Sequence, residues 1–141
     1  MTVVNSGYSY LDLASEWGRP VEENRLLPKI LQAAKRSDIA ISAISLWETA
    51  MLIQKGRITV SGDTLDWFHQ ALTAPGISVI PLTAEIAVDS TTLPGKFHGD
   101  PADRIIVSTT RLNDATLISL DDNIRQYGSA GYVKVLSKAP K

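Results

Sequence analysis

Short apolar runs alternate with longer segments of helical periodicity along most of the chain. We predict a strand at each short run, because such runs bounded by turn residues are typical of buried strands. The predicted strands cover residues 2–4, 39–42, 77–80, 116–119 and 132–135.

Helical spacing of apolar residues fills most of the intervals between these strands. In residues 24–36 apolar side chains recur every three or four positions, and Pro28 suits the first turn of a helix. A second helix is predicted from Ser45 and ends at Gly56, because glycine suits a left-handed cap. Further helices are predicted over residues 63–72, 83–93 and 101–112.

The alternation of short strands with helices predicts an α/β domain, whose mainly parallel sheet of about five strands is flanked by helices. The chain of 141 residues is long enough for one such domain, 1–141, and no repeat or linker divides it. In sheets of this kind, ligands bind beyond the carboxyl ends of the strands. Polar residues that follow the predicted strands are therefore the candidates for a site.

Composition narrows the class of protein. Hydrophobic residues make up 44% of the chain and charged residues 21%, which is close to the average of folded globular proteins and argues against disorder. The chain has no cysteine, which excludes disulfides, thiolate metal sites and a cysteine nucleophile. No apolar run reaches the roughly 20 residues of a membrane span, and residues 1–13 lack the features of a secretory signal. We therefore expect a cytoplasmic protein.

The formal net charge of −1 gives the molecule no broad positive field for non-specific binding of nucleic acid. Any such binding must be local. The basic residues are scattered, and each belongs either to a solvated surface or to a local contact with phosphate. They include Lys55, Arg57, Lys96, Arg104, Arg111 and Arg125.

Acidic residues follow several of the predicted strands. Glu48 lies in the first turn of the helix after one strand, and Asp103 lies in the first turn of a later helix. Asp121 and Asp122 come directly after another strand. If these strands are parallel neighbours, carboxylates from three distant parts of the chain converge at one edge of the sheet.

Each of these acids also has a purely structural explanation. Ser45 and Glu48 fit a capping box, in which each side chain binds a backbone amide at the start of the helix. Asp100 fits a helix N-cap, followed by proline and then by Asp103, whose charge complements the helix dipole. Asp121 can simply end a strand. Capping therefore remains open as the role of each acid taken singly.

A metal site would explain why several carboxylates gather. Two carboxylates 4 Å apart repel by about 4 kcal/mol at an effective dielectric constant near 20. Mg²⁺ or Mn²⁺ neutralises such a cluster, because hard cations prefer carboxylate oxygen and water. Phosphodiester hydrolysis by a metal-activated water then fits, since it needs no side-chain nucleophile. The two histidines, His69 and His98, are in no setting typical of serine or histidine catalysis.

Four segments of the chain together resemble one family of proteins. In their order and separation they resemble the PIN-domain ribonucleases of the VapC toxin type, and the resemblance covers most of the chain from Leu26 onward. It implies a PIN-like three-layer sandwich, cleavage of RNA with bound Mg²⁺ or Mn²⁺, a small VapB-like antitoxin as partner, and a homodimer. The segments are ISAISLWETAMLIQKGRI (41–58), PLTAEIAV (81–88), HGDPADRIIVST (98–109) and TLISLDDNIRQYG (116–128).

The resemblance also implies roles for particular residues. Glu48, Asp103 and Asp121 match the family's acids that bind the metal and carry catalysis. Asp100 matches an extra acid, for which capping or support of the metal site is expected. Arg104 is expected either to contact RNA phosphate or to brace the site.

The first acid of the family pattern is where this chain departs from it. PIN domains of this type begin with an apolar strand that ends in aspartate, whereas residues 2–4 are followed by Asn5. An amide oxygen can bind a metal but brings no negative charge. Asp12 is the alternative occupant, although the residues after it suit the family pattern less well. Two hypotheses follow: a nuclease completed by Asn5 or Asp12, or a PIN-fold binding module that has lost catalysis through Asn5.

Overall fold

In the part of the chain that the structure describes, five parallel strands form a single sheet. The computed structural model describes residues 1–4, 38–73, 76–119 and 121–136. The strands are arranged in the order β3-β2-β1-β4-β5, which confirms the predicted parallel sheet of an α/β domain. Their bounds are β1 Thr2–Val4, β2 Ile39–Ser42, β3 Ile77–Ile80, β4 Thr116–Ile118 and β5 Lys134–Leu136.

The order of the strands reverses at β1, the central strand. β1 pairs with β2 on one side, where Val4 lies opposite Ile41, and with β4 on the other, where Val4 lies opposite Ile118. The chain builds β2 and β3 outward in one direction before it builds β4 and β5 in the other. Ligands of doubly wound sheets bind at such a reversal, outside the carboxyl ends of the strands.

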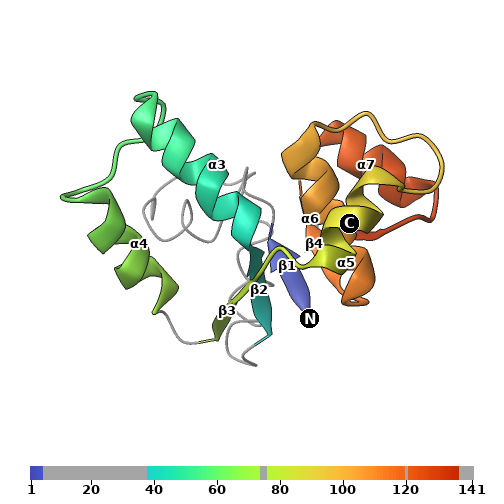
Figure 1. The fold of residues 1–141 in the computed structure, drawn as a ribbon, viewed down its shortest axis with the longest axis horizontal. Helices are drawn as coiled ribbons and strands as arrows, with labels where there is room; N and C mark the ends of the chain where they lie inside the picture. The colour runs from blue at the N-terminus through green and yellow to red at the C-terminus, as the bar shows by residue number, and fades with distance from the viewer. Residues whose placement is uncertain (5–37, 74–75, 120, 137–141) are drawn as a thin grey trace, which may run out of the picture.

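Helices cover the sheet from both sides. Figure 1 shows α3 and α4 on one side of the strands, and α5, α6 and α7 grouped on the other. No helix among the described residues is long and apolar enough to cross a bilayer. The helix predicted over residues 24–36 lies outside the described residues. The described helices are α3 Ala43–Gln54, α4 Thr64–Leu72, α5 Ala84–Thr91, α6 Pro101–Leu112 and α7 Asp122–Ser129.

Helix α3 begins at Ala43, before the predicted start at Ser45. The strand β2 leads directly into it, and Ser42 is the N-cap, whose side-chain oxygen accepts a hydrogen bond from the Ile44 N–H at 3.4 Å. Ser45 is fully buried inside the first turn. The predicted capping box of Ser45 and Glu48 is therefore wrong, because the helix has already started before Ser45.

The last strand also differs from its prediction, since β5 covers residues 134–136 rather than 132–135. Tyr132 belongs to the turn after α7, and its N–H donates to the carbonyl of Tyr127 at 3.4 Å. The two tyrosine rings stack with their centroids 4.8 Å apart. This stacking holds Tyr132 outside the strand.

The hydrophobic core joins the sheet to α6 and α7. Val3 and Leu117 from the strands pack in one cluster with Ile106 and Val107 from α6, and all four are fully buried. Burial of an aliphatic side chain of this size stabilises the fold by about 1.5 to 3 kcal/mol. Because α6 also contacts α3, α5, β2 and β4, the core fixes the position of the residues at its start.

Candidate metal centre

The candidate acids are arranged around the carboxyl ends of three neighbouring strands, β2, β1 and β4. Glu48 lies on α3, which follows β2, and Asp121 comes three residues after the end of β4. Asn5 directly follows β1 in the sequence. Both Asn5 and Asp12 lie outside the described residues, so the occupant of the first-acid position stays a prediction.

Asp100 and Asp103 take the positions predicted for them at the start of α6. Asp100 is the N-cap, Pro101 is the first helical residue, and Asp103 lies in the first turn. The Asp100 carboxylate accepts a hydrogen bond from the Asp103 N–H at 2.8 Å, and the Asp103 carboxyl in turn bonds to the backbone of Asp100. The pair forms a capping box. The capping role of Asp100 is thus confirmed. Both carboxyl groups of the capping box lie at the start of α6, at the edge of the sheet.

Asp121 is the N-cap of α7. Its Oδ1 accepts a hydrogen bond from the Ile124 N–H at 3.0 Å, and its own N–H donates to Ser119 Oγ at 3.1 Å. Asp122 begins the helix, and its exposed carboxylate pairs with Arg125. The two neighbouring acids are therefore distinct: Asp121 is held at the end of β4, whereas Asp122 points to solvent.

The sequence predicts Glu48 in the first turn of its helix, but it lies in the second turn of α3. The reason is that the helix starts directly after β2. It is half-buried, between Trp47, which is 58% exposed, and Thr49, which is buried. Its charge acts on Asp103, which lies on a different helix. Glu48 therefore faces the same edge of the sheet as the start of α6.

Three carboxylates act on a fourth, that of Asp103, at this edge. Partial burial raises the pKa of the Asp103 carboxyl from 3.8 to about 7, and the charges of Asp100, Asp121 and Glu48 act in the same direction, in that order of strength. The hydrogen bond with the backbone of Asp100 opposes the rise in pKa. Like charges raise a carboxyl pKa in this way only from nearby. We call these four residues, Glu48, Asp100, Asp103 and Asp121, the acid cluster.

The chemistry of the acid cluster fits a hard divalent cation. Carboxylate oxygens are the donors that Mg²⁺ and Mn²⁺ prefer, and a cation would offset the repulsion that adds to the effect of burial on the pKa of Asp103. Within the described part of the chain, no group of three acidic or histidine side chains is already arranged to hold a metal ion.

Arg104 braces the segment that leads into α6. Its Nε donates to the carbonyl of Ser90 at 2.8 Å, and its Nη1 donates to the carbonyl of Phe97 at 3.1 Å. Ser90 lies in α5, and Phe97 lies in the loop between α5 and α6. Of the two roles expected for Arg104, these hydrogen bonds support bracing.

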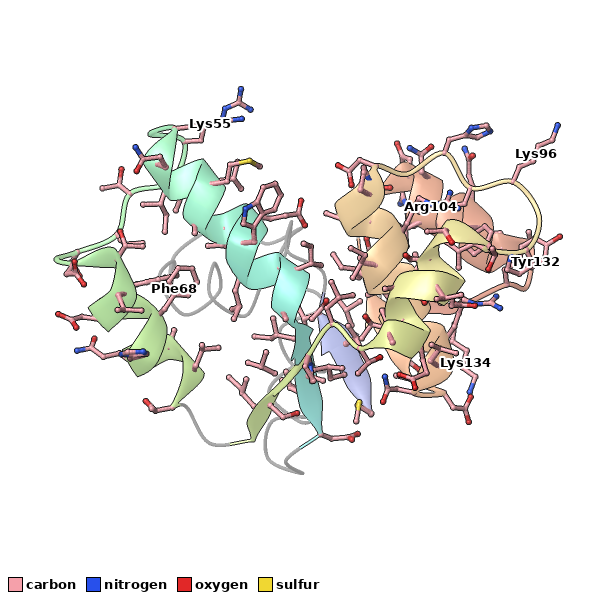
Figure 2. The ribbon with its side chains drawn as sticks, viewed as in Figure 1. Lys55, Phe68, Lys96, Arg104, Tyr132 and Lys134 are labelled. Atoms are coloured by element: carbon pink, nitrogen blue, oxygen red, sulfur yellow. The ribbon has the colours of Figure 1, made fainter. Side chains whose placement is uncertain are left out.

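The other basic residues do not gather at the acid cluster as a group. Arg111 lies in the last turn of α6, at the opposite end from Asp103, where it donates to the carbonyl of Tyr132 at 2.8 Å. Lys55 and Lys96 are exposed on different elements, and Figure 2 shows them far apart across the molecule. The scattered distribution read from the sequence therefore holds for these residues in the structure.

The fold and the acid cluster define a doubly wound α/β protein with an acidic site at the carboxyl edge of its sheet. The family model of the PIN domain matches residues 16–130. Ribonuclease VapC22 of Mycobacterium tuberculosis is 33% identical to this chain over 107 residues, which make up 75% of this chain and 81% of that protein. The chain therefore belongs to the PIN domain family, and its resemblance to the VapC-type members is confirmed.

Solved structures share the fold over nearly the whole chain. The crystal structure of VapBC2 from Rickettsia felis, bound to a DNA fragment from their promoter, matches with a TM-score of 0.67, 15% identity and coverage of 98% of both chains. A toxin-antitoxin complex from Klebsiella pneumoniae matches with a TM-score of 0.62, 21% identity and coverage of 100% of both chains. At these identities the likeness supports the PIN-like fold, which the sequence predicted.

Proposed function

We propose that this chain is a metal-dependent endoribonuclease, the toxin of a VapBC-type toxin-antitoxin pair, and that a single PIN domain, 1–141, carries the activity. The observation that carries the proposal is the gathering of the acid cluster at the edge where doubly wound sheets bind their ligands, where partial burial and the charges of the three other carboxylates raise the pKa of Asp103. Its second support is the 33% identity with a ribonuclease of the VapC type.

In this proposal, Glu48, Asp103 and Asp121 hold Mg²⁺ or Mn²⁺, and Asn5 or Asp12 completes the site. The N-caps at Asp100 and Asp121 fix the starts of α6 and α7, so the carboxylates are held before the cation binds. When bound, the cation activates water and stabilises the charge that develops on the leaving oxygen of the phosphodiester. The ionised form of Asp103 becomes favourable once a positive charge offsets its acidic neighbours.

The proposed partners are RNA as substrate, a small VapB-like antitoxin, and a second copy of the chain in a homodimer. Two of the similar solved structures are complexes of toxins with antitoxins, which supports a protein partner of this kind. We place the activity in the cytoplasm, because the proposed substrate is cellular RNA.

The test is an RNA cleavage assay with purified protein, in Mn²⁺ and in excess chelator. Wild type is expected to cleave only with metal, and Asp103→Asn is expected to lose cleavage. Asp114→Asn is the matched control, because Asp114 follows the opposite end of α6 and has a φ of 48°, which asparagine adopts readily. Equal cleavage by wild type and Asp103→Asn would contradict the proposal.

The alternative function is a PIN-fold binding module that has lost catalysis through Asn5. It predicts that wild type is inactive and that Asn5→Asp gains metal-dependent cleavage. The ribonuclease function is favoured, because the similar curated protein is a ribonuclease. If neither wild type nor Asn5→Asp cleaves, while both bind Mn²⁺ in isothermal titration, the site binds metal without the proposed activity.

A further inference from the structure

The loop between α5 and α6 is anchored in the core although much of it faces solvent. Two of its side chains, Leu93 and Phe97, are only 8% and 9% exposed and belong to the core cluster. Lys96 and His98, on either side of Phe97, are exposed. We call residues 93–100 the anchored loop.

Hydrogen bonds from two helices hold the backbone of the anchored loop. The hydroxyl of Tyr127, on α7, donates to the carbonyl of Pro94 at 2.5 Å. Arg104, on α6, donates to the carbonyl of Phe97 at 3.1 Å, while its other hydrogen bond holds Ser90 at the end of α5. The backbone around Lys96 is therefore fixed on both sides.

Close packing ties the same loop to the acid cluster. The ring of Phe97 lies against that of Tyr127, with centroids 5.0 Å apart. At Gly99, a Cβ atom would meet the ring of Phe97 and would lie 2.9 Å from the Cβ of Asp103. No side chain fits between Phe97 and Asp103, so a shift of the loop would shift the acid.

The anchored loop places positive or hydrogen-bond-donating side chains on the segment that leads to the acid cluster, where the negative charge of RNA is otherwise repelled. RNA is a polyanion, and the acid cluster that it must approach is itself negative. Along the chain, His98 is two residues from Asp100, which limits the separation of their Cα atoms to about 7.2 Å. Figure 2 shows the side chain of Lys96 extending outward from the loop, whereas Arg104 lies among the helices.

Other cations in this half of the molecule are engaged with protein groups. Arg111 donates to the carbonyl of Tyr132, Arg125 pairs with Asp122, and Lys134 pairs with Asp114 at 2.8 Å. Arg104 holds two carbonyls of the chain. Among the residues that the structure describes, Lys96 and His98 are exposed donors on the fixed backbone that leads into Asp100.

We propose that Lys96 and His98 form a preorganised subsite for a phosphate group of single-stranded RNA, beside the phosphate that is cleaved. The proposal rests on the proposed function and names the part of the chain that holds its substrate. The Lys96 ammonium and a His98 ring N–H donate to phosphate oxygens. Because the loop is already ordered, binding costs less conformational entropy than contact with a flexible loop. Arg104 is a positioning residue, which acts through the loop.

The test compares Lys96→Ala, His98→Ala and the double variant with Lys134→Ala, a matched lysine at the start of β5. With a fluorescent single-stranded RNA, the loss of Lys96 is expected to raise KM about fourfold near 0.15 M monovalent salt and to leave kcat unchanged. It should also reduce the slope of log affinity against log salt by about 0.7. Lys134→Ala should change neither KM nor the salt slope.

The positioning role of Arg104 has its own readout. Arg104→Ala should raise KM in the wild-type background, and the rise should be smaller in the Lys96→Ala, His98→Ala background, because both changes disrupt the same phosphate contact. Equal effects in the two backgrounds would show that Arg104 acts only through stability.

RNA binding measured in the inactive Asp103→Asn background separates the two proposals. If wild type cleaves RNA and the double variant keeps its KM and its salt slope, the subsite is overturned while the proposed function stands. If wild type does not cleave in Mn²⁺, the proposed function fails, and fluorescence anisotropy decides the subsite. Unchanged RNA affinity of the double variant would then overturn it, and weakened affinity with a smaller salt slope would support it.

Discussion

Asp100 and Asp103 cap the start of α6 for each other, yet the charge of Asp100 also raises the pKa of the Asp103 carboxyl. One carboxylate thus stabilises the helix and, at the same time, disfavours the charge of its capping partner. Strongly shifted carboxyl pKa values are frequent at functional sites, where acids are held close together despite their repulsion. The pair is therefore both a structural cap and the centre of the acid cluster.

Replacement of Asp100 separates these two effects. Asp100→Asn keeps a good N-cap and removes the charge, so it should lower the pKa of Asp103 with little change in stability. Asp100→Ala also loses the cap and should reduce the free energy of unfolding by about 0.5 to 2 kcal/mol. Urea unfolding and NMR titration of the Asp103 carboxyl measure the two quantities. Equal destabilisation by the two variants would argue against the cap.

Replacement of Asp103 should make the thermal stability of the protein much less dependent on bound metal. Without metal, Asp103→Asn removes a repelled carboxylate and should melt at a higher temperature than wild type. Wild type should gain about 2.7 kcal/mol of stability at a Mn²⁺ concentration near 100 times its Kd, and the variant should gain far less. Thermal melts with Mn²⁺ and with chelator measure this, with Asp114→Asn as the control. A variant that Mn²⁺ stabilises as well as wild type would place the metal elsewhere.

The stability of the metal-free protein should fall as the pH rises. The pKa of Asp103 is raised from 3.8 to about 7, so between these values the folded state binds more protons than the unfolded state. The contribution of the protonated Asp103 carboxyl to the free energy of unfolding is fully present below about pH 4 and is lost as the pH rises through about 7. The loss should be roughly 2 kcal/mol once solvent screening of a partly exposed group is allowed for.

Urea unfolding in chelator, at about pH 5 and about pH 8, measures this loss. Asp103→Asn should show a smaller difference between the two pH values, whereas Asp114→Asn should behave as wild type does. Identical pH dependence of wild type and Asp103→Asn would mean that another group is responsible.

Removal of the Arg104 side chain should destabilise the fold, because it breaks hydrogen bonds to parts of the chain outside α6. Arg104→Ala leaves the carbonyls of Ser90 and Phe97 without their donor, which should cost about 1 to 3 kcal/mol. Arg104→Lys keeps the charge but not the forked geometry and should recover only part of the loss. Urea unfolding measures both, and Arg57→Ala, at an exposed arginine, is the control. A loss no greater than that of the control would exclude bracing.

The sequence predicts best those elements whose signals are local. The start of α6 follows from Asp100 and Pro101, because an N-cap and a proline at the first position act within one turn. Ser42 and Ser45 carry the same capping signal, so the sequence alone does not show at which serine α3 starts. Only burial distinguishes the two serines, since β2 leads directly into the helix and takes Ser45 into the core.

The sequence predicts the site less well, because the site depends on long-range arrangement. The spacing of Glu48, Asp103 and Asp121 carries no information on strand order, so the alternation of strands and helices predicts their convergence only on the condition that the strands are parallel neighbours. The bracing by Arg104 joins it to backbone carbonyls 7 and 14 positions away, and backbone acceptors leave no trace in a sequence. The anchoring of residues 93–100 leaves no sequence signal for the same reason.

The pairing of β1 with β4 joins the beginning of the chain to a segment near its end, since Thr2 lies opposite Thr116. The central strand, β1, is therefore synthesised early, but it can pair with β4 only after most of the polypeptide has been translated. Asp121 emerges from the ribosome later still. For the proposed nuclease, this order of synthesis means that the acid cluster is complete only after most of the chain has been translated.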